Sequence, residues 1–192
     1  MGFSRDELES FRDATVPDLV GPDLKLLFVG INPGLWTAAT QTHFAHPGNR
    51  FYPALTMAGI ITRTIDRGEG MTDDDRAHLL ERGIGISNVV HRTTARASEL
   101  STTELREGGV QLRQFVAEHR PAVVAIAGIT AYRSAFKQPK AVMGEQDDDF
   151  EGSRLWVVPN PSGLNAHETI ASLAVAYAEP AEVAGIALEP PQ

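Results

Sequence analysis

The chain has 192 residues, of which 25 are acidic and 17 are basic, so its formal net charge is −8 at pH 7. This length is sufficient for one domain with a substantial core and is short for two. A content of 42% hydrophobic and 22% charged residues excludes a disordered, collagen-like or coiled-coil chain. We expect a single domain over residues 1–188, followed by a disordered tail over residues 189–192.

The chain contains no cysteine, which excludes disulfides, iron–sulfur clusters, thiol nucleophiles and cysteine-ligated zinc. No apolar run approaches the roughly 18 residues of a membrane span. The acidic N-terminal segment is unlike a signal or transit peptide. We therefore expect a cytoplasmic protein that has no membrane partner.

The negative charge is concentrated in three segments. Residues 1–24, 145–151 and 179–192 together hold fourteen acidic and two basic residues, a net charge of −12, so the remainder carries +4. Such runs usually lie on solvated surfaces, which is the simpler interpretation. The functional alternative is that the central body keeps a weakly basic face. Because nucleic-acid affinity depends largely on phosphate neutralisation by Lys and Arg, the net charge argues against such a partner, and its distribution weakens that objection.

Helices and strands are expected to alternate along the chain, because apolar runs bounded by turn residues alternate with capping-box pairs and helical apolar stripes. In the first half we expect a helix opened by Ser4 and Glu7, a strand at 25–31, a helix at 49–60, a helix from Thr72 to Gly83, and a strand at 84–90. In the second half we expect a helix opened by Ser101 and Glu104, a strand at 122–127, a helix after Gly128, a loop or hairpin at 145–151, a strand at 155–158, and a helix at 166–178 that Pro180 interrupts. This alternation predicts an α/β fold with a parallel sheet covered on both faces.

Ligands bind outside the carboxyl ends of the strands in such sheets. This rule selects four loops, at residues 30–34 (GINPG), 87–94 (SNVVHRTT), 128–130 (GIT) and 160–165 (NPSGLN). Two of them place Asn-Pro directly after a buried apolar strand. Two ordinary turns would also produce this pattern. The functional alternative is that both loops aim a neutral amide into one cleft.

Asn32, in the first Asn-Pro loop, offers a donor and an acceptor without charge. It can therefore hold a water in line with an electrophile, but it cannot take the proton of that water as a carboxylate would. A reaction that uses Asn32 must need little base catalysis. Cleavage of an N-glycosidic bond fits, because the sugar becomes cationic before water attacks strongly and backbone N–H groups can stabilise the departing base.

Three further side chains have two interpretations each. Phe44 either stacks on a flat base or fills a small core under its loop. Leu164, between Gly163 and Asn165, either wedges into a base stack or acts as the hydrophobic staple of the following helix. His91 follows the second strand and has either a site role or a loop hydrogen-bonding role. The six histidines form no HExxH or other dense ligand pattern, so we expect no metal.

Three motifs together resemble the mismatch-specific uracil and thymine DNA glycosylases of the uracil-DNA glycosylase superfamily: GINPG at 30–34, FAHPGNRFY at 44–52 and NPSGLN at 160–165. The likeness runs over residues 25–177. It implies a three-layer α/β/α sandwich around a mostly parallel sheet of four to five strands. It also implies monofunctional excision of uracil, with thymine or ethenocytosine as further substrates, opposite guanine in duplex DNA. The product is an abasic site, no metal or cofactor is used, and we expect a monomer.

The resemblance assigns roles to individual residues. Asn32 matches the water-positioning asparagine, Ile31 supplies a backbone contact to the flipped base, and Phe44 matches the stacking aromatic. Asn160 matches the asparagine of the second motif, near the base and its sugar-phosphate. Asn88 occupies a position in the base pocket.

The wedge of the family is matched by Gly163, Leu164 and Asn165, where Leu164 fills the vacated stack. The family often has a basic residue soon after the wedge, whereas Ala166 and His167 stand here. This departure weakens the expected binding to the DNA strand opposite the flipped base.

The loop after the second strand also departs from the family pattern. Asn88 stands where bacterial relatives can have lysine, and His91 stands where a carboxylate is often found. A histidine there either alters base preference or positions water itself. Two other functions remain open: a damage- or mismatch-binding module with little turnover, and a nucleoside hydrolase that uses the same pocket.

Overall fold

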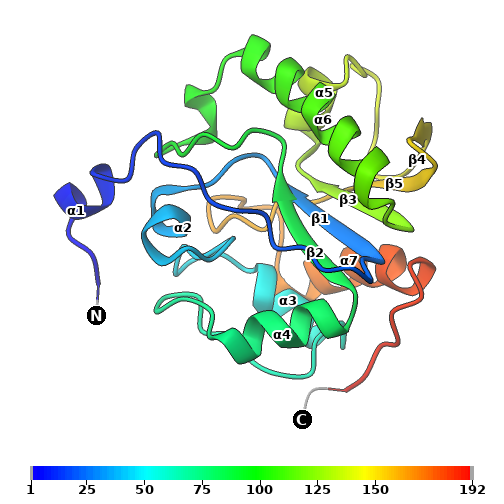
Figure 1. The fold of residues 1–192 in the computed structure, drawn as a ribbon, viewed down its shortest axis with the longest axis horizontal. Helices are drawn as coiled ribbons and strands as arrows, with labels where there is room; N and C mark the ends of the chain where they lie inside the picture. Colours follow the sequence, from blue (N-terminus) through cyan, green and yellow to red (C-terminus); the bar gives the residue numbers. More distant parts are fainter. Residues whose placement is uncertain (1, 191–192) are drawn as a thin grey trace.

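A five-stranded sheet forms the centre of the computed structural model, which describes residues 2–190 (Figure 1). The strands are β1 (Leu26–Gly30), β2 (Ile84–Asn88), β3 (Val123–Ala127), β4 (Gly144–Phe150) and β5 (Ser153–Val158), and their order is β2-β1-β3-β5-β4. Neighbouring strands are parallel except β4, which pairs antiparallel with β5 at one edge. The four parallel strands are the four predicted from apolar runs.

Alternate residues of the parallel strands pack on opposite faces of the sheet, as strand geometry requires. In β1, Leu26 and Phe28 belong to one hydrophobic cluster, whereas Leu27 and Val29 belong to the other. All five residues of β1 are buried. The continuous apolar sequence of this strand is therefore the consequence of burial on both faces.

Helices cover both faces of the sheet. Their bounds are α1 (Arg5–Glu9), α2 (Leu35–Thr40), α3 (Phe51–Met57), α4 (Asp73–Glu81), α5 (Thr102–His119), α6 (Ile129–Ala135) and α7 (Ile170–Val183), with a short 3-10 helix at Ala97–Glu99. Residues of α3, α4 and α7 join the cluster on one face, and residues of α5 and α6 join the cluster on the other. The result is the expected three-layer α/β/α sandwich (Figure 1). No helix within residues 2–190 is both long enough and apolar enough to cross a membrane.

The predicted capping boxes are present. Ser101 Oγ accepts the Glu104 amide at 3.1 Å, and the Glu104 carboxylate accepts the Ser101 amide at 2.8 Å. Equivalent pairs open α1 at Ser4 and α4 at Thr72. Each pair satisfies amides that have no partner within the helix, which is why these sequence positions mark helix starts.

Helix α7 differs from its prediction at both ends. It begins at Ile170 behind the cap Thr169 instead of near residue 166, and it runs through Pro180 to Val183. Proline removes one helical hydrogen bond. Here Pro180 is buried beside Tyr177 and Ala181, so packing holds the last turn in place.

The acidic residues 145–151 form most of the edge strand β4, so the hairpin alternative is correct. Its burial alternates along the strand, and charged residues stand on the exposed side. Charge on an edge strand opposes pairing with other chains.

Glu189, the first residue of the tail expected to be disordered over residues 189–192, contacts the body of the domain. Its amide donates to the Gly59 oxygen at 2.9 Å, and its carboxylate pairs with Arg82 at 2.8 Å. A Cβ at position 59 would lie 2.3 Å from the Glu189 oxygen, so this close approach requires glycine there. Residues 191–192, in the rest of the predicted tail, lie outside the described residues.

Candidate active site

A cleft of about 550 Å³ lies where β1, β2 and β5 end at the same edge of the sheet. The predicted site residues in its wall are Ile31, Asn32, Phe44, Asn88, Asn160, Gly163 and Leu164. The structure therefore brings both Asn-Pro loops to one cleft. Asn165 and His91 do not belong to this wall. A second hollow of about 420 Å³ beside α3 is lined mainly by apolar side chains and holds no predicted site residue.

Backbone hydrogen bonds continue beyond the strand ends and join the two loops that follow β1 and β2. The Val89 and Val90 amides donate to the oxygens of Gly30 and Ile31 at 2.9 and 3.0 Å. Further along, the Thr94 amide donates to the Pro33 oxygen at 3.2 Å. The loop that carries Asn32 is therefore held along its length by the loop after β2.

The amide group of Asn32 has a defined orientation. Its Nδ2 lies 2.9 Å from the Arg92 oxygen, 2.8 Å from Thr94 Oγ1 and 3.2 Å from the Pro33 oxygen. Two of these partners are carbonyl oxygens, which only accept, so the amide nitrogen must point toward them. The Oδ1 atom accepts no hydrogen bond from the described residues and is not sealed from solvent. Asn32 therefore presents a fixed acceptor to the cleft.

Phe44 belongs both to the core and to the cleft wall. Its ring centroid lies 4.1 Å from that of Phe51, with the rings tilted by 30°, and the side chain is half-buried. Its φ is +56°, in the left-handed region that bulky residues rarely adopt. The two interpretations of Phe44 are compatible, because a ring supported from below by Phe51 can still border the cleft.

Gly30 explains how an amide and an aromatic ring meet at the floor of the cleft. A Cβ at this position would lie 2.6 Å from Asn88 Oδ1 and 3.2 Å from the Phe44 ring. The first glycine of the GINPG motif is therefore required by space. Its absent side chain lets Asn88 and Phe44 approach β1 together.

The second Asn-Pro loop is held by local hydrogen bonds. Asn160 Oδ1 accepts the Ser162 amide at 3.0 Å, and Asn165 Nδ2 donates to the Asn160 backbone oxygen at 3.1 Å. Asn160 thus forms the ordinary turn that Asn-Pro sequences suggest. Its Nδ2 atom donates to no other described residue, so it remains available to a ligand in the cleft.

Leu164 is 92% exposed at the rim of the cleft. The cap of α7 is Thr169, five residues further on, so the hydrophobic-staple interpretation of Leu164 is wrong. Arg50 fixes the loop from inside: its guanidinium donates to the backbone oxygens of Ser162, Gly163, Asn165 and Glu168. A large apolar side chain is therefore exposed to solvent on a loop that is held by hydrogen bonds.

Comparison with known proteins identifies the chain. The family model described as the uracil DNA glycosylase superfamily matches residues 17–179, most of the sequence. The chain belongs to the uracil DNA glycosylase superfamily. The solution structure of a candidate uracil DNA glycosylase from Methanosarcina acetivorans is similar in fold, with a TM-score of 0.59 and 15% sequence identity. The match covers 87% of this chain and 97% of that one, so the two proteins share the whole fold.

Membership of this superfamily supports the general activity of a DNA glycosylase. Such an enzyme hydrolyses N-glycosyl bonds and acts in DNA repair. The cleft fits this chemistry, because its wall combines neutral amides with aromatic and apolar side chains. An amide that holds water is suited to a reaction in which the substrate develops positive charge before attack.

His91 does not line this cleft and instead pairs with Asp18. Its Nε2 lies 3.2 and 3.3 Å from the two carboxylate oxygens of Asp18, in the segment that precedes β1. This hydrogen bond is the main cause that raises the pKa of His91 above its ordinary value, although partial burial opposes the shift. The geometry corresponds to the loop hydrogen-bonding interpretation of His91 and does not place its ring in the wall of the cleft.

Several residues in or behind the cleft were not predicted as site residues. His43 contacts Asn88, and Thr94 orients Asn32. Arg50 holds the loop that carries Leu164, and Trp36 lines the cleft. His43 contacts Pro17 and Asn88, which are 26 and 45 residues away in the sequence. No local motif reports such partners, so only the fold could reveal this role.

Proposed function

We propose that the protein is a monofunctional DNA glycosylase that flips uracil out of a G·U mismatch in duplex DNA and hydrolyses its N-glycosidic bond. The observation that carries this proposal is the oriented amide of Asn32. It shares one cleft with the half-buried ring of Phe44 and the exposed wedge Leu164. These parts correspond to water positioning, base stacking and filling of the vacated stack.

The reaction begins with loss of the C1′–N1 bond, whose electron pair leaves with the uracil anion. Asn32 Oδ1 accepts a hydrogen bond from a water and holds its oxygen toward C1′. The water oxygen then bonds to C1′ and its proton passes to solvent, leaving an abasic site. Because Asn32 cannot take that proton, attack follows sugar cation formation instead of driving it.

Recognition of the flipped base uses the floor of the same cleft. The Phe44 ring stacks on the uracil, the Ile31 backbone contacts it, and Asn88 and Asn160 supply polar contacts at its edges. Leu164 occupies the space that the base leaves in the duplex. A G·U pair is weaker than a Watson–Crick pair, so flipping costs less there, which favours excision from mismatches.

Replacement of Asn32 with alanine tests the water-positioning role. We expect excision from a G·U duplex to fall by about 100-fold or more, as when one oriented polar group is removed from an active site. Strand scission by alkali at the abasic product measures the rate, and binding to the uncleaved duplex should be retained. A near-wild-type rate would assign the water to another group.

The wild-type protein itself separates the enzyme from a binding module. Absence of strand scission with Asn32 intact would contradict the glycosylase proposal and leave a damage-binding protein. A panel of uracil, thymine and ethenocytosine opposite guanine then defines the base range.

A nucleoside hydrolase would cleave free deoxyuridine and would not need the wedge. The 92% exposure of Leu164 argues against this alternative, because a free nucleoside has no base stack to fill. We expect Leu164→Ala to reduce uracil excision from duplex DNA by about tenfold, with a smaller loss on single-stranded DNA. If wild type and Leu164→Ala excise uracil from duplex DNA at equal rates, the nucleoside hydrolase would be favoured.

A further inference from the structure

His43 lies between the N-terminal segment and the floor of the cleft, and it is only 4% exposed. Its Nε2 lies 2.9 Å from the Pro17 oxygen, and its Nδ1 lies 3.2 Å from Asn88 Nδ2. The Tyr52 hydroxyl donates to the His43 backbone oxygen at 2.7 Å. The imidazole is thus held on both sides and leaves little freedom to its neighbour Asn88.

These contacts determine which ring nitrogen of His43 carries the proton. A carbonyl oxygen only accepts hydrogen bonds, so the Pro17 contact requires a proton on Nε2. In the neutral ring, Nδ1 then carries a lone pair and accepts. Asn88 must therefore turn its NH₂ group toward His43, and its Oδ1 atom to the opposite side.

Asn88 Oδ1 faces the cleft floor. It lies 2.6 Å from the position of a Cβ on Gly30, which is also 3.2 Å from the Phe44 ring. Oδ1 accepts no hydrogen bond from the described residues and is not sealed from solvent. An acceptor therefore stands beside the ring on which a flipped base would stack.

We propose that His43 is a positioning residue that fixes the polarity of the Asn88 amide, so that the cleft reads an N–H donor at N3 of the flipped pyrimidine. Uracil and thymine carry such a donor, whereas cytosine carries a lone pair at N3, which would face the Asn88 oxygen. This inference rests on the proposed function, because it assigns the base specificity of the same cleft.

The electrostatic surroundings of His43 favour the neutral ring. Burial lowers the pKa of His43, His91 and Arg76 lower it further, and the Pro17 hydrogen bond and the Asp18 charge act in the opposite direction. A protonated ring would donate from both nitrogens and would require the Asn88 amide to turn. Neutral His43 therefore keeps the acceptor of Asn88 in the cleft.

Two substitutions at His43 separate positioning from simple packing. In His43→Asn, the side-chain oxygen can take the place of Nδ1 and accept from Asn88, while the Pro17 contact is lost. In His43→Gln, the terminal NH₂ can take the place of Nε2 and donate to Pro17, while the acceptor for Asn88 is lost. Both variants remove the aromatic ring, so they are matched for packing.

The readout is base preference in binding. Duplexes with a 2′-fluoroarabino uridine or cytidine opposite an abasic analogue resist cleavage, and neither target base is paired. We expect wild type to bind the uracil duplex about tenfold more tightly than the cytosine duplex, roughly the effect of one favourable contact replaced by an unfavourable one. His43→Asn should keep most of this ratio, and His43→Gln should reduce it to about threefold or less.

An unchanged ratio in His43→Gln would overturn the inference, as would equal loss in both variants. Nitrogen-15 NMR chemical shifts of the wild-type histidine rings provide a test that needs no variant. A neutral His43 ring with its proton on Nδ1 instead of Nε2 would also overturn the inference. Uracil excision from a G·U duplex is measured alongside. Wild type that shows the binding ratio but no excision would contradict the proposed function and still support the role of His43.

Discussion

At the scale of single residues, the side-chain amides of Asn32 and Asn88 are oriented in the same way. Each NH₂ group is directed to protein acceptors, at Arg92 and Thr94 for Asn32 and at His43 for Asn88, which leaves each oxygen free in the cleft. An amide has no intrinsic polarity toward a ligand, because either end can face it. The partners of each amide therefore decide what the cleft can recognise.

The sequence predicted well which residues reach the cleft. It did not predict which atoms of their side chains face the cleft. The Asn-Pro motifs place Asn32 and Asn160 at strand ends, which is a local property. The partners that orient Asn32 at Arg92 and Thr94 are 60 and 62 residues away. His91 was misplaced for the same reason, since its partner Asp18 is 73 residues distant. Long-range hydrogen bonds leave no trace in local spacing.

The His91–Asp18 contact predicts a pH-dependent stability. The pKa of His91 is raised in the folded protein, so the contact adds stability that is fully present below the ordinary value of about 6.5. That contribution is lost as the pH rises through the raised value. Urea unfolding of wild type and His91→Gln should therefore differ more in free energy at about pH 5.5 than at about pH 8.5. Equal differences at both pH values would contradict a charged pair.

At the scale of elements, the sequence predicted those structures that depend on local signals. Capping boxes and apolar runs gave the starts of α4 and α5 and the four parallel strands. Helix α2 was missed, because it has six residues and Gly34 caps it without a side-chain hydrogen bond. Helix α7 passed through Pro180 because tertiary packing of Tyr177 and Ala181 outweighed the local preference.

Because α5 packs closely against the loop after β2, replacing a helical glycine with alanine should here lower stability instead of raising it. Alanine normally stabilises a helix interior by about 1 kcal/mol relative to glycine. At Gly108, however, a Cβ would lie 2.1 Å from the Val89 backbone oxygen. We expect Gly108→Ala to lower the free energy of unfolding by about 1–3 kcal/mol, as overpacking does. Urea denaturation measures the change.

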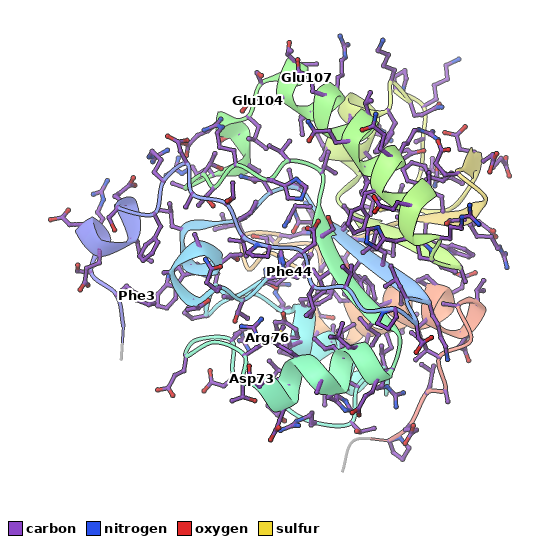
Figure 2. The ribbon with its side chains drawn as sticks, viewed as in Figure 1. Phe3, Phe44, Asp73, Arg76, Glu104 and Glu107 are labelled. Atoms are coloured by element: carbon purple, nitrogen blue, oxygen red, sulfur yellow. The ribbon has the colours of Figure 1, made fainter. Side chains whose placement is uncertain are left out.

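Glu107 provides the matched control on the same helix. It is exposed and lies on the outer side of α5 (Figure 2). We expect Glu107→Ala to change the free energy by no more than about 0.5 kcal/mol. A stabilised Gly108→Ala protein would mean that α5 can move away from Val89, whose amide supports Gly30 beside the cleft.

At the scale of the whole molecule, the topology of the sheet assembles the site. Strand order β2-β1-β3-β5-β4 places the ends of β1, β2 and β5 at one edge, although their cleft residues extend from Ile31 to Leu164. The alternation of strands and helices predicted the sheet, but the strand order is a long-range property. The sequence therefore indicated four candidate loops without showing which of them meet.

The topology of the sheet places two of the acidic segments at different distances from the cleft. Strand β4, which carries the acidic hairpin, lies at the sheet edge opposite β2 (Figure 1). Helix α1 instead borders the cleft: Leu8 belongs to its wall, and the Phe3 ring packs 5.2 Å from that of Trp36. The acidic hairpin therefore lies at the edge of the sheet, whereas the acidic N-terminal helix lies beside the cleft.

Neutralising one carboxylate in each segment tests this arrangement. Asp6 in α1 and Asp147 in β4 are both exposed, and neither side chain forms a hydrogen bond or ion pair with another described residue. If duplex DNA approaches the cleft, Asp6→Asn should tighten binding about twofold at low salt, because one nearby repulsive charge is removed. The effect should vanish in about 0.5 M salt, where screening shortens the range of charge interactions to a few ångströms. Asp147→Asn should leave the affinity unchanged, and an equal gain in both variants would show that DNA responds to net charge instead of to the charge beside the cleft.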